Sequence, residues 1–315
     1  MIPSLSYIAS RLRIRQLRLL IALDEHGTLH RAAERMAISQ PGATKALHEI
    51  EATFGMPLFN RSNLGLQAND MGRCVIRYAR LIDSDLAHLR EEMLGILQGH
   101  GGHLAIGTVA GSVPLVLRAL TDLRQVQPDI SVQIVEDISP RLLKLLDEGR
   151  LDLAVARISG SQHPDAYECL SLHPERLALV ANPQHPQQRN PALSLADLTP
   201  YSWVVYPTAT PMRLVIEREF SEAGLEFPRY PLETSSTFTM LSLLQEDPTL
   251  VAVMPDSIAS SSEGFGLLRR LPLELQSRNE PCAIIHRRGT DLSPLAQLLL
   301  EHLRSQQEQE ATLAD

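Results

Sequence analysis

A regular apolar repeat between residues 75 and 96 constrains the fold of this chain more than any other feature. Its members follow one another at alternating intervals of four and three residues, which is a 3.5-residue period kept over three heptads. The repeat consists of Val75, Ala79, Ile82, Leu86, Leu89, Met93 and Ile96. Such a seam predicts one long helix over residues 70–98 that pairs with a second copy of the chain. The alternative is that the helix packs against its own chain.

The rest of the sequence divides around this helix. A length of 315 residues exceeds one ordinary domain, and a glycine cluster at residues 99–102 predicts a hinge after the helix. From residue 103 onward, strand-like and helix-like runs alternate, which predicts a parallel sheet flanked by helices. The expected organisation is a helical head at 1–69, the helix at 70–98, the hinge at 99–102, an α/β region at 103–304 and a flexible tail at 305–315.

The charge is distributed unevenly between these parts. The whole chain carries a net charge of −8, but residues 1–69 hold eight basic and five acidic side chains and the remainder is strongly acidic. A basic head on an acidic body is typical of a DNA-binding domain joined to a partner module. No apolar run approaches the roughly 20 residues of a membrane helix and no secretory signal is visible, so we expect a cytoplasmic protein without a membrane partner. Three scattered cysteines fit a reducing compartment.

Two short helices in the head have the features of a DNA-binding pair. Thr28 is a suitable N-cap for a helix carrying the small pair Ala32-Ala33, which allows a second helix to cross closely. Ser39 caps that second helix, and Pro41 lies in its first turn. The polar face of the second helix carries Gln40, Thr44, Lys45 and His48. The alternative is that residues 40–54 form an ordinary surface helix of a bundle.

The residues of this pair resemble a known family. The segment 32–45, AAERMAISQPGATK, is similar to the helix-turn-helix of LysR-type transcription regulators, A-A-x-x-L-x-[ILV]-[ST]-Q-[PS]-[AS]-[LV]-[ST]-[RK]. The similarity continues through Ile50-Glu51, Phe54-Gly55, Pro57-Leu58-Phe59 and Arg61 into Gly65-Leu66, which would form the wing of a winged helix-turn-helix. Gly42 and the segment 69–72, NDMG in place of T-P-A-G, depart from the family pattern.

The resemblance implies which residues meet DNA. Side chains of the second helix would enter the major groove, and residues near the wing would contact the backbone. The expected DNA-binding set is Thr28, Arg31, Ser39, Gln40, Pro41, Thr44, Lys45, Arg61, Ser62 and Asn63. Lys45 has two interpretations, a phosphate contact or a base contact. His48 is interpreted as a solvated helix residue rather than a base reader.

Several predicted helices of the α/β region begin at a capping residue just after a strand. Ser112, Ser139, Thr210 and Ser236 hold these positions. Helix starts at the ends of parallel strands expose backbone N–H groups and a partial positive charge. If these ends meet in one cleft, the expected ligand is an anion or a polar molecule with a carboxylate. The alternative for each serine is a purely structural cap.

Two further patterns resemble the effector domains of the same family. They are P-x-I-x-V at 128–132 and L-x-x-G-x-L-D-L-A at 146–154. These domains are similar to periplasmic binding proteins, which implies lobe I at 103–178 plus 268–304, lobe II at 179–267, and a ligand between them. Candidate effector contacts are Ser112, Ser139, Arg157, Tyr206, Thr208 and Ser236. Arg157 could instead pair with an acidic neighbour, and Tyr206 could belong to the core.

Other chemistry finds little support in the sequence. No G-x-S-x-G, G-x-G-x-x-G or Walker motif occurs, so we expect neither an enzyme nor a cofactor. His100 and His103 lie in the hinge without acidic or cysteine partners, which favours a linker over a metal site. Cys169 and Cys282 are either a redox pair or inert buried thiols.

The sequence therefore predicts a LysR-type regulator with an all-α head, a long linker helix and a two-lobed α/β effector domain. Its expected partners are double-stranded promoter or operator DNA, a small-molecule effector and, as a further candidate, RNA polymerase. The resemblance implies a homodimer or homotetramer. The alternative is a solute-binding protein without a DNA role, which the N-terminal helix-turn-helix disfavours.

Overall fold

The chain forms two compact units. The computed structural model describes residues 2–62, 65–98, 101–159, 161, 163–172, 174–208, 210–277 and 280–314. The first unit comprises residues 1–102 with the short turn 147–150, and the second comprises the other residues from 103 onward. Asn63 and the first two hinge residues, 99 and 100, lie outside the described residues.

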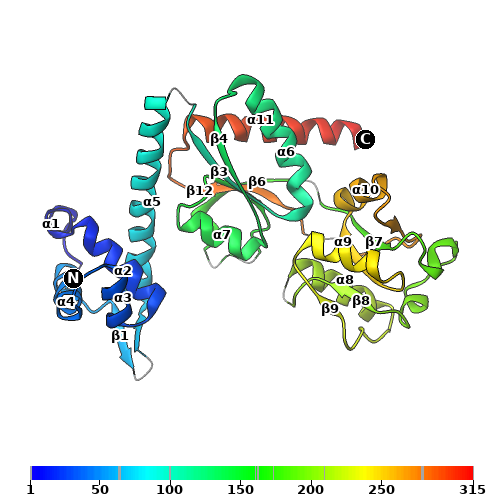
Figure 1. The fold of residues 1–315 in the computed structure, drawn as a ribbon, viewed down its shortest axis with the longest axis horizontal. Helices are drawn as coiled ribbons and strands as arrows, with labels where there is room; N and C mark the ends of the chain where they lie inside the picture. Colours follow the sequence, from blue (N-terminus) through cyan, green and yellow to red (C-terminus); the bar gives the residue numbers. More distant parts are fainter. Residues whose placement is uncertain are drawn as a thin grey trace. The chain divides into compact units, whose positions relative to one another are not determined.

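The first unit is built from helices that local capping signals start and stop (Figure 1). Its helices are α1 (Leu5–Arg11), α2 (Ile14–His26), α3 (Leu29–Arg35), α4 (Gln40–Phe54) and α5 (Asp70–Gln98). The Thr28 side chain accepts a hydrogen bond from the backbone N–H of Arg31 at the start of α3, and Ser39 does the same for Gly42 at the start of α4. Gly27 ends α2 in the left-handed conformation, which glycine adopts without a steric penalty.

The core of this unit lies where α2, α3, α4 and the start of α5 meet. Apolar side chains at helical spacing are almost completely buried there: Leu20, Leu23, Ala32, Ala33, Leu47, Ile50 and Ile76. Strands β1 (Phe59–Ser62) and β2 (Gly65–Ala68) pair antiparallel and form the wing. A Cβ on Gly72 would collide with the carbonyl oxygen of Leu58, so glycine permits the close approach of α5 to the residue before β1.

The second unit contains two separate sheets flanked by helices. The first sheet has the strand order β4-β3-β5-β12-β6. Its strands are β3 (His103–Thr108), β4 (Ser131–Glu136), β5 (Leu153–Ala156), β6 (Tyr167–Ser171) and β12 (Ala283–Arg287), and its helices are α6 (Val113–Val126), α7 (Ser139–Asp147) and α11 (Pro294–Ala314). Strand β3 runs parallel to β4 and β5. The crossovers through α6 and α7 move in opposite directions across this sheet, and since such crossovers are right-handed, the two helices cover opposite faces. Helix α11 packs beside α6 (Figure 1).

The second sheet has the strand order β11-β7-β10-β8-β9. Its strands are β7 (Leu177–Ala181), β8 (Trp203–Val205), β9 (Leu232–Glu233), β10 (Val251–Pro255) and β11 (Arg269–Arg270), and the helices around it are α8 (Pro211–Glu222), α9 (Thr237–Glu246) and α10 (Asp256–Gly264). The central strand β10 is buried along its whole length, as expected for a strand covered on both faces.

Both sheets are mixed, whereas the alternation of strands and helices predicts parallel ones. Strand β12 runs antiparallel to β5 and β6, and β7 runs antiparallel to β10 and β11. Strands β7 and β12 follow the two passages of the chain between the sheets. They therefore enter their sheet from its neighbour and not from a crossover helix.

Two boundaries differ from the sequence-based expectation. The second sheet runs from Leu177 to Arg270, so the expected lobe limits 179–267 cut into strand β7 and fall just before β11. The segment after residue 304, expected to be a flexible tail, is helical as far as Ala314, since α11 continues to that residue. Side chains hold this extension: the Gln306 amide donates to the Asp122 carboxylate at 2.6 Å, and Gln307 donates to the backbone of strand β6. None of the described helices is both long and apolar enough to cross a lipid bilayer.

Candidate nucleic-acid interface and effector site

Helix α4 has one buried side and one exposed polar side. Ala43, Leu47 and Ile50 face the core of the head. The predicted DNA-reading residues Gln40, Pro41 and Lys45 are exposed, as are His48 and Glu49, and Thr44 is half-buried. The 3.6-residue period of the helix separates the two sides, so the buried set and the polar set follow from the same sequence pattern.

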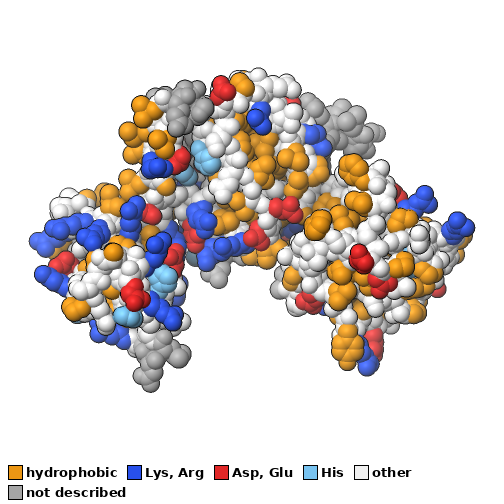
Figure 2. Space-filling model, viewed as in Figure 1, with side chains coloured by type: hydrophobic (Ala, Val, Ile, Leu, Met, Phe, Trp, Pro, Cys, Tyr) orange, Lys and Arg blue, Asp and Glu red, His pale blue; other side chains and the backbone are white. Residues whose placement is uncertain are grey.

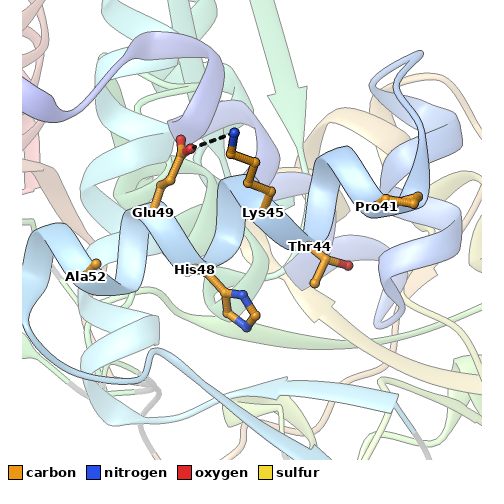
Figure 3. A pocket seen from close by; sticks show the side chains of 6 residues that line it. All are labelled: Pro41, Thr44, Lys45, His48, Glu49 and Ala52. Carbon is orange, nitrogen blue, oxygen red and sulfur yellow. Dashed lines mark ion pairs between the residues drawn. The ribbon is translucent and has the colours of Figure 1, made fainter.

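The polar side of α4 is a shallow hollow on the surface. It is lined by Pro41, Thr44, Lys45, His48, Glu49 and Ala52. Figure 3 shows Lys45 and Glu49 pointing to one edge of the helix, and Thr44 and His48 to the other. The Lys45 amine lies 4.0 Å from the Glu49 carboxylate, and its side chain is 81% exposed. A long exposed cation in such a weak contact is available to a DNA phosphate or base.

The wing approaches the same helix. The Arg61 guanidinium on β1 lies 3.3 Å from the His48 imidazole, so the structure brings these two side chains together. Arg31 at the start of α3 is exposed. The hydroxyls of Thr28 and Ser39 act as helix caps, which leaves their second lone pair and their proton for other contacts.

Basic side chains cover the surface of the head (Figure 2). All eight lysine and arginine residues of the head before residue 69 are exposed: Arg11, Arg13, Arg15, Arg18, Arg31, Arg35, Lys45 and Arg61. Their exposure makes the positive charge of this segment available to a polyanion.

The apolar repeat of α5 divides into two parts. Ala79 is fully buried and Val75 is half-buried against the core of the head, so these two positions are occupied within the chain. Further along, Ile82, Leu89 and Met93 are exposed. The early part of the repeat therefore attaches α5 to the head, and only the later part presents apolar side chains to the outside.

An arginine strengthens the attachment of α5 to the head. Arg80 donates hydrogen bonds to the carboxylates of Asp24 and Glu25 at the end of α2, at 3.0 and 2.9 Å. Burial lowers the pKa of Arg80, but these hydrogen bonds outweigh it and raise the pKa above its ordinary value. The guanidinium therefore remains charged and holds α2 against α5.

Four of the predicted effector residues gather around one acidic side chain in the second unit. The Arg157 guanidinium lies 2.5 Å from the Glu175 carboxylate, and both side chains are largely buried. The Ser139 hydroxyl accepts a hydrogen bond from the backbone N–H of Arg157. Ser112 contacts the thiol of Cys282, and the charges of Arg157 and Glu175 both act on that thiol. Arg157 therefore pairs with an acidic neighbour, which was the alternative to a ligand contact for this residue.

Tyr206 extends this cluster from the second sheet. Its side chain is 7% exposed, and its hydroxyl lies beside that of Thr237 without a hydrogen bond of good geometry to any described residue. Burial raises the pKa of Tyr206, and the Glu175 carboxylate raises it further. Ser236, which caps α9 next to Thr237, and Thr208 are exposed.

The cysteines do not form a disulfide in this fold. Cys169 on β6 pairs in register with Ile285, three residues after Cys282 on the neighbouring strand. At roughly 3.3 Å per residue the two cysteines are about 10 Å apart along the strands, beyond the roughly 7 Å limit between Cα atoms. Cys282 is buried, whereas Cys169 is exposed, so the expectation of two buried thiols is wrong for Cys169. Desolvation still raises the pKa of both thiols, which disfavours the reactive thiolate. Among the described side chains, no group of three or more His, Cys, Asp or Glu residues could hold a metal ion.

Sequence reasoning did not find Glu175, Thr237 or Gly111. Glu175 lies in the passage between the two sheets, just before strand β7. A charged residue in a passage that leads directly into a buried strand is a signal that could have identified it, because its partner must then come from a neighbouring element.

A winged helix-turn-helix head, a long helix and a two-sheet α/β unit with a buried polar cluster define a ligand-responsive transcription regulator. Comparison with family models agrees: "Bacterial regulatory helix-turn-helix protein, lysR family" matches residues 14–73, and "LysR substrate binding domain" matches residues 97–308. The chain belongs to the LysR family of transcriptional regulators. Its N-terminal unit is DNA-binding, and its C-terminal unit is an effector-binding domain.

Individual relatives give the same result. The HTH-type transcriptional regulator GbpR of Azospirillum brasilense is 32% identical over 305 residues, covering 96% of this chain and 89% of the relative. Full-length CbnR complexed with its target DNA has the same fold, with a TM-score of 0.61, 21% identity, and coverage of 94% of this chain and 100% of CbnR. The effector-binding domain of QuiR in complex with shikimate matches 67% of this chain and 98% of that domain, with a TM-score of 0.56 and 18% identity. GbpR and CbnR are both described as transcriptional regulators.

Proposed function

We propose that this regulator reads its operator with the polar side of α4 and holds the DNA backbone with the wing. Gln40, Pro41, Thr44 and Lys45 enter the major groove, where short polar and basic side chains reach base edges and phosphates. Arg61 on the wing and Arg31 on α3 contact phosphates. The observation that supports this assignment is the exposed polar side of α4, above all the open Lys45 side chain. Ser62 and Asn63 remain predictions from the family resemblance.

We further propose that the later part of α5 joins two chains. Ile82, Leu89 and Met93 form an exposed apolar stripe that cannot remain in water at low cost, and half-buried Leu86 lies along the same stripe. Pairing with the same stripe of a second copy covers all four and brings two heads to one operator. Two heads match the two half-sites of a palindromic operator.

The effector, on this proposal, binds at the polar cluster around Glu175, Arg157 and Tyr206. A bound ligand favours one arrangement of the effector domains, and the linker helices transmit that arrangement to the heads. The change in spacing between heads alters the footprint and the bend of the DNA. RNA polymerase is the partner that would detect this change at a promoter. The site of action is then the cytoplasm, where promoter DNA is found.

Selection of DNA from a random-sequence pool tests the central claim. The full chain should enrich a palindromic site and shift it in a gel at nanomolar protein concentration. A Thr44→Ala, Lys45→Ala double variant should lose that shift while keeping its unfolding midpoint. Enrichment of no sequence, or full binding by the double variant, would contradict the assignment of α4.

A further inference from the structure

The passage between the two sheets places a carboxylate at the start of a helix. Glu175 lies against Gly111 so closely that a Cβ at position 111 would collide with its carboxylate. Gly111 belongs to the 3-10 turn η1 (Ala110–Ser112), which continues directly into α6. A helix start attracts anions through its backbone N–H groups and its dipole. In this chain an internal anion therefore already rests at that position.

The Glu175 carboxylate is also the ion-pair partner of Arg157. Arg157 is 4% exposed and Glu175 13% exposed, and they form an ion pair. The remaining donor capacity of the Arg157 guanidinium is partly used as well, because its Nε donates to the carbonyl oxygen of Glu280 at 2.9 Å. A carboxylate on an incoming ligand would have to compete with Glu175 for this guanidinium.

The charges near the Tyr206 hydroxyl also disfavour an anion. Glu175, Arg157 and Glu136 are the charged groups that act on this hydroxyl. The charges of Glu175 and Arg157 offset each other within the buried ion pair, and the exposed Glu136 adds a further carboxylate whose charge also acts on this hydroxyl. Placing a further negative charge beside a like charge in a largely desolvated site is strongly unfavourable.

The cluster nevertheless has unmet hydrogen-bonding capacity. The hydroxyl oxygens of Tyr206 and Thr237 are shielded from solvent and lie beside each other, without a hydrogen bond of good geometry to any other described residue. Buried polar atoms are almost always paired, so such exceptions occur where a ligand or a bound water completes the pairing. Hydroxyl groups can both donate and accept, and they complement the hydroxyls of another uncharged polar molecule.

We propose that the effector of this regulator is an uncharged molecule with several hydroxyl groups, such as a monosaccharide or a cyclitol, because Glu175 already occupies the anion position beside Arg157 and Gly111. The inference rests on the proposed effector site, and it replaces the anionic ligand expected from the helix starts. The Glu175 carboxylate accepts hydrogen bonds from ligand hydroxyls, and Tyr206 and Thr237 supply the complementary donors.

Matched ligand sets test the charge preference on the full chain. We would measure the unfolding midpoint and the titration calorimetry of the wild type with D-glucose, D-glucuronate and D-glucosamine, with the corresponding galactose set, and with myo-inositol. A neutral member should raise the midpoint and bind at least about tenfold more tightly than its uronate and its amine. Equal or tighter binding of a charged member, or no shift with any neutral member, would overturn the proposal.

Two variants identify which carboxylate causes the preference for a neutral sugar over its uronate. Glu175→Gln keeps the shape of the side chain and frees Arg157, so the preference for the neutral sugar over its uronate should fall by about tenfold or more. Glu136→Gln changes an exposed side chain that forms no part of the ion pair, and should reduce the preference less. If Glu175→Gln does not fold, the comparison of neutral and charged sugars on the wild type decides: equal or tighter binding of a charged member contradicts the charge argument. DNA selection without ligand tests the proposed function separately, because it does not depend on which effector binds.

Discussion

Replacing Lys45 with alanine gives the most direct test of how this regulator meets DNA. The side chain is 81% exposed, and its single ion pair, with Glu49 one turn further along α4, spans 4.0 Å. An exposed pair at this spacing contributes about 0.3–0.5 kcal/mol to stability. The Lys45→Ala protein should therefore unfold within about 0.5 kcal/mol of the wild type, so that any large loss of binding comes from the interface.

The expected loss of affinity follows from what the amine contacts. A base contact contributes about 1–3 kcal/mol of discrimination at one base pair, which is a factor of roughly 5 to 150 in the dissociation constant. A phosphate contact instead weakens binding to every sequence and lowers the slope of log affinity against log salt by about one. The assay is fluorescence anisotropy with the selected operator and single-base variants of it, at several salt concentrations.

Two matched variants complete this experiment. Glu49→Gln removes the negative charge beside Lys45 on the same face, and it should strengthen DNA binding modestly. Lys144→Ala removes a lysine charge from helix α7 of the other unit, which holds none of the proposed DNA contacts, and should leave the affinity within about twofold. If Lys45→Ala changes neither the affinity for DNA nor the salt slope, the assignment of α4 to the major groove is refuted.

Three other predictions address assembly, stability and pH. Leu89→Glu on the exposed stripe of α5 should weaken self-association at least about tenfold in analytical ultracentrifugation, because it places a charge in an apolar contact. Ala87→Glu on the other side of the helix should not weaken it. Equal behaviour of the two variants would exclude the stripe as the interface. Ile50→Ala should cost about 2–5 kcal/mol of unfolding free energy by urea denaturation, since its side chain is fully buried, and a cost below about 1 kcal/mol would contradict the described core. Burial lowers the pKa of His185, so on lowering the pH the unfolded chain takes up a proton near pH 6.5, before the folded chain does. The contribution of His185 to the free energy of unfolding should therefore be fully present above that pH and decline below it. His185→Gln should remove this part of the acid sensitivity.

Local patterns were sufficient for the DNA-binding head. Ser39 as a cap, Pro41 in the first turn and the helical spacing of Ala43, Leu47 and Ile50 all act within a few residues, so they can be recognised without tertiary information. The exposed polar side of α4 follows from that spacing. The family resemblance of the same segment identified the class of protein, and the family models agree with it.

The repeat of α5 shows where local pattern stops being informative. Its 3.5-residue period predicts a helix, but the period alone does not distinguish Ala79, which is buried in the head, from Leu89, which is exposed. The difference arises because only the first turns of α5 pass along the core of the head. The tail is a related case: contacts with Asp122 and strand β6, far away in the sequence, accompany the continuation of α11.

The amino-acid sequence by itself determined the helix-turn-helix, the long helix and the α/β character of the second unit, because each depends on periodicity and capping between near neighbours. Tertiary structure alone decided the chemistry of the buried polar cluster that we propose as the effector site. Arg157 follows strand β5 and Glu175 lies in the passage before β7, so their ion pair depends on the folded chain. Their charges act on the Tyr206 hydroxyl only after the second sheet has formed. Two charges compensate each other only when they lie close together in space. The folded chain therefore decides whether Arg157 is open to a ligand or already paired.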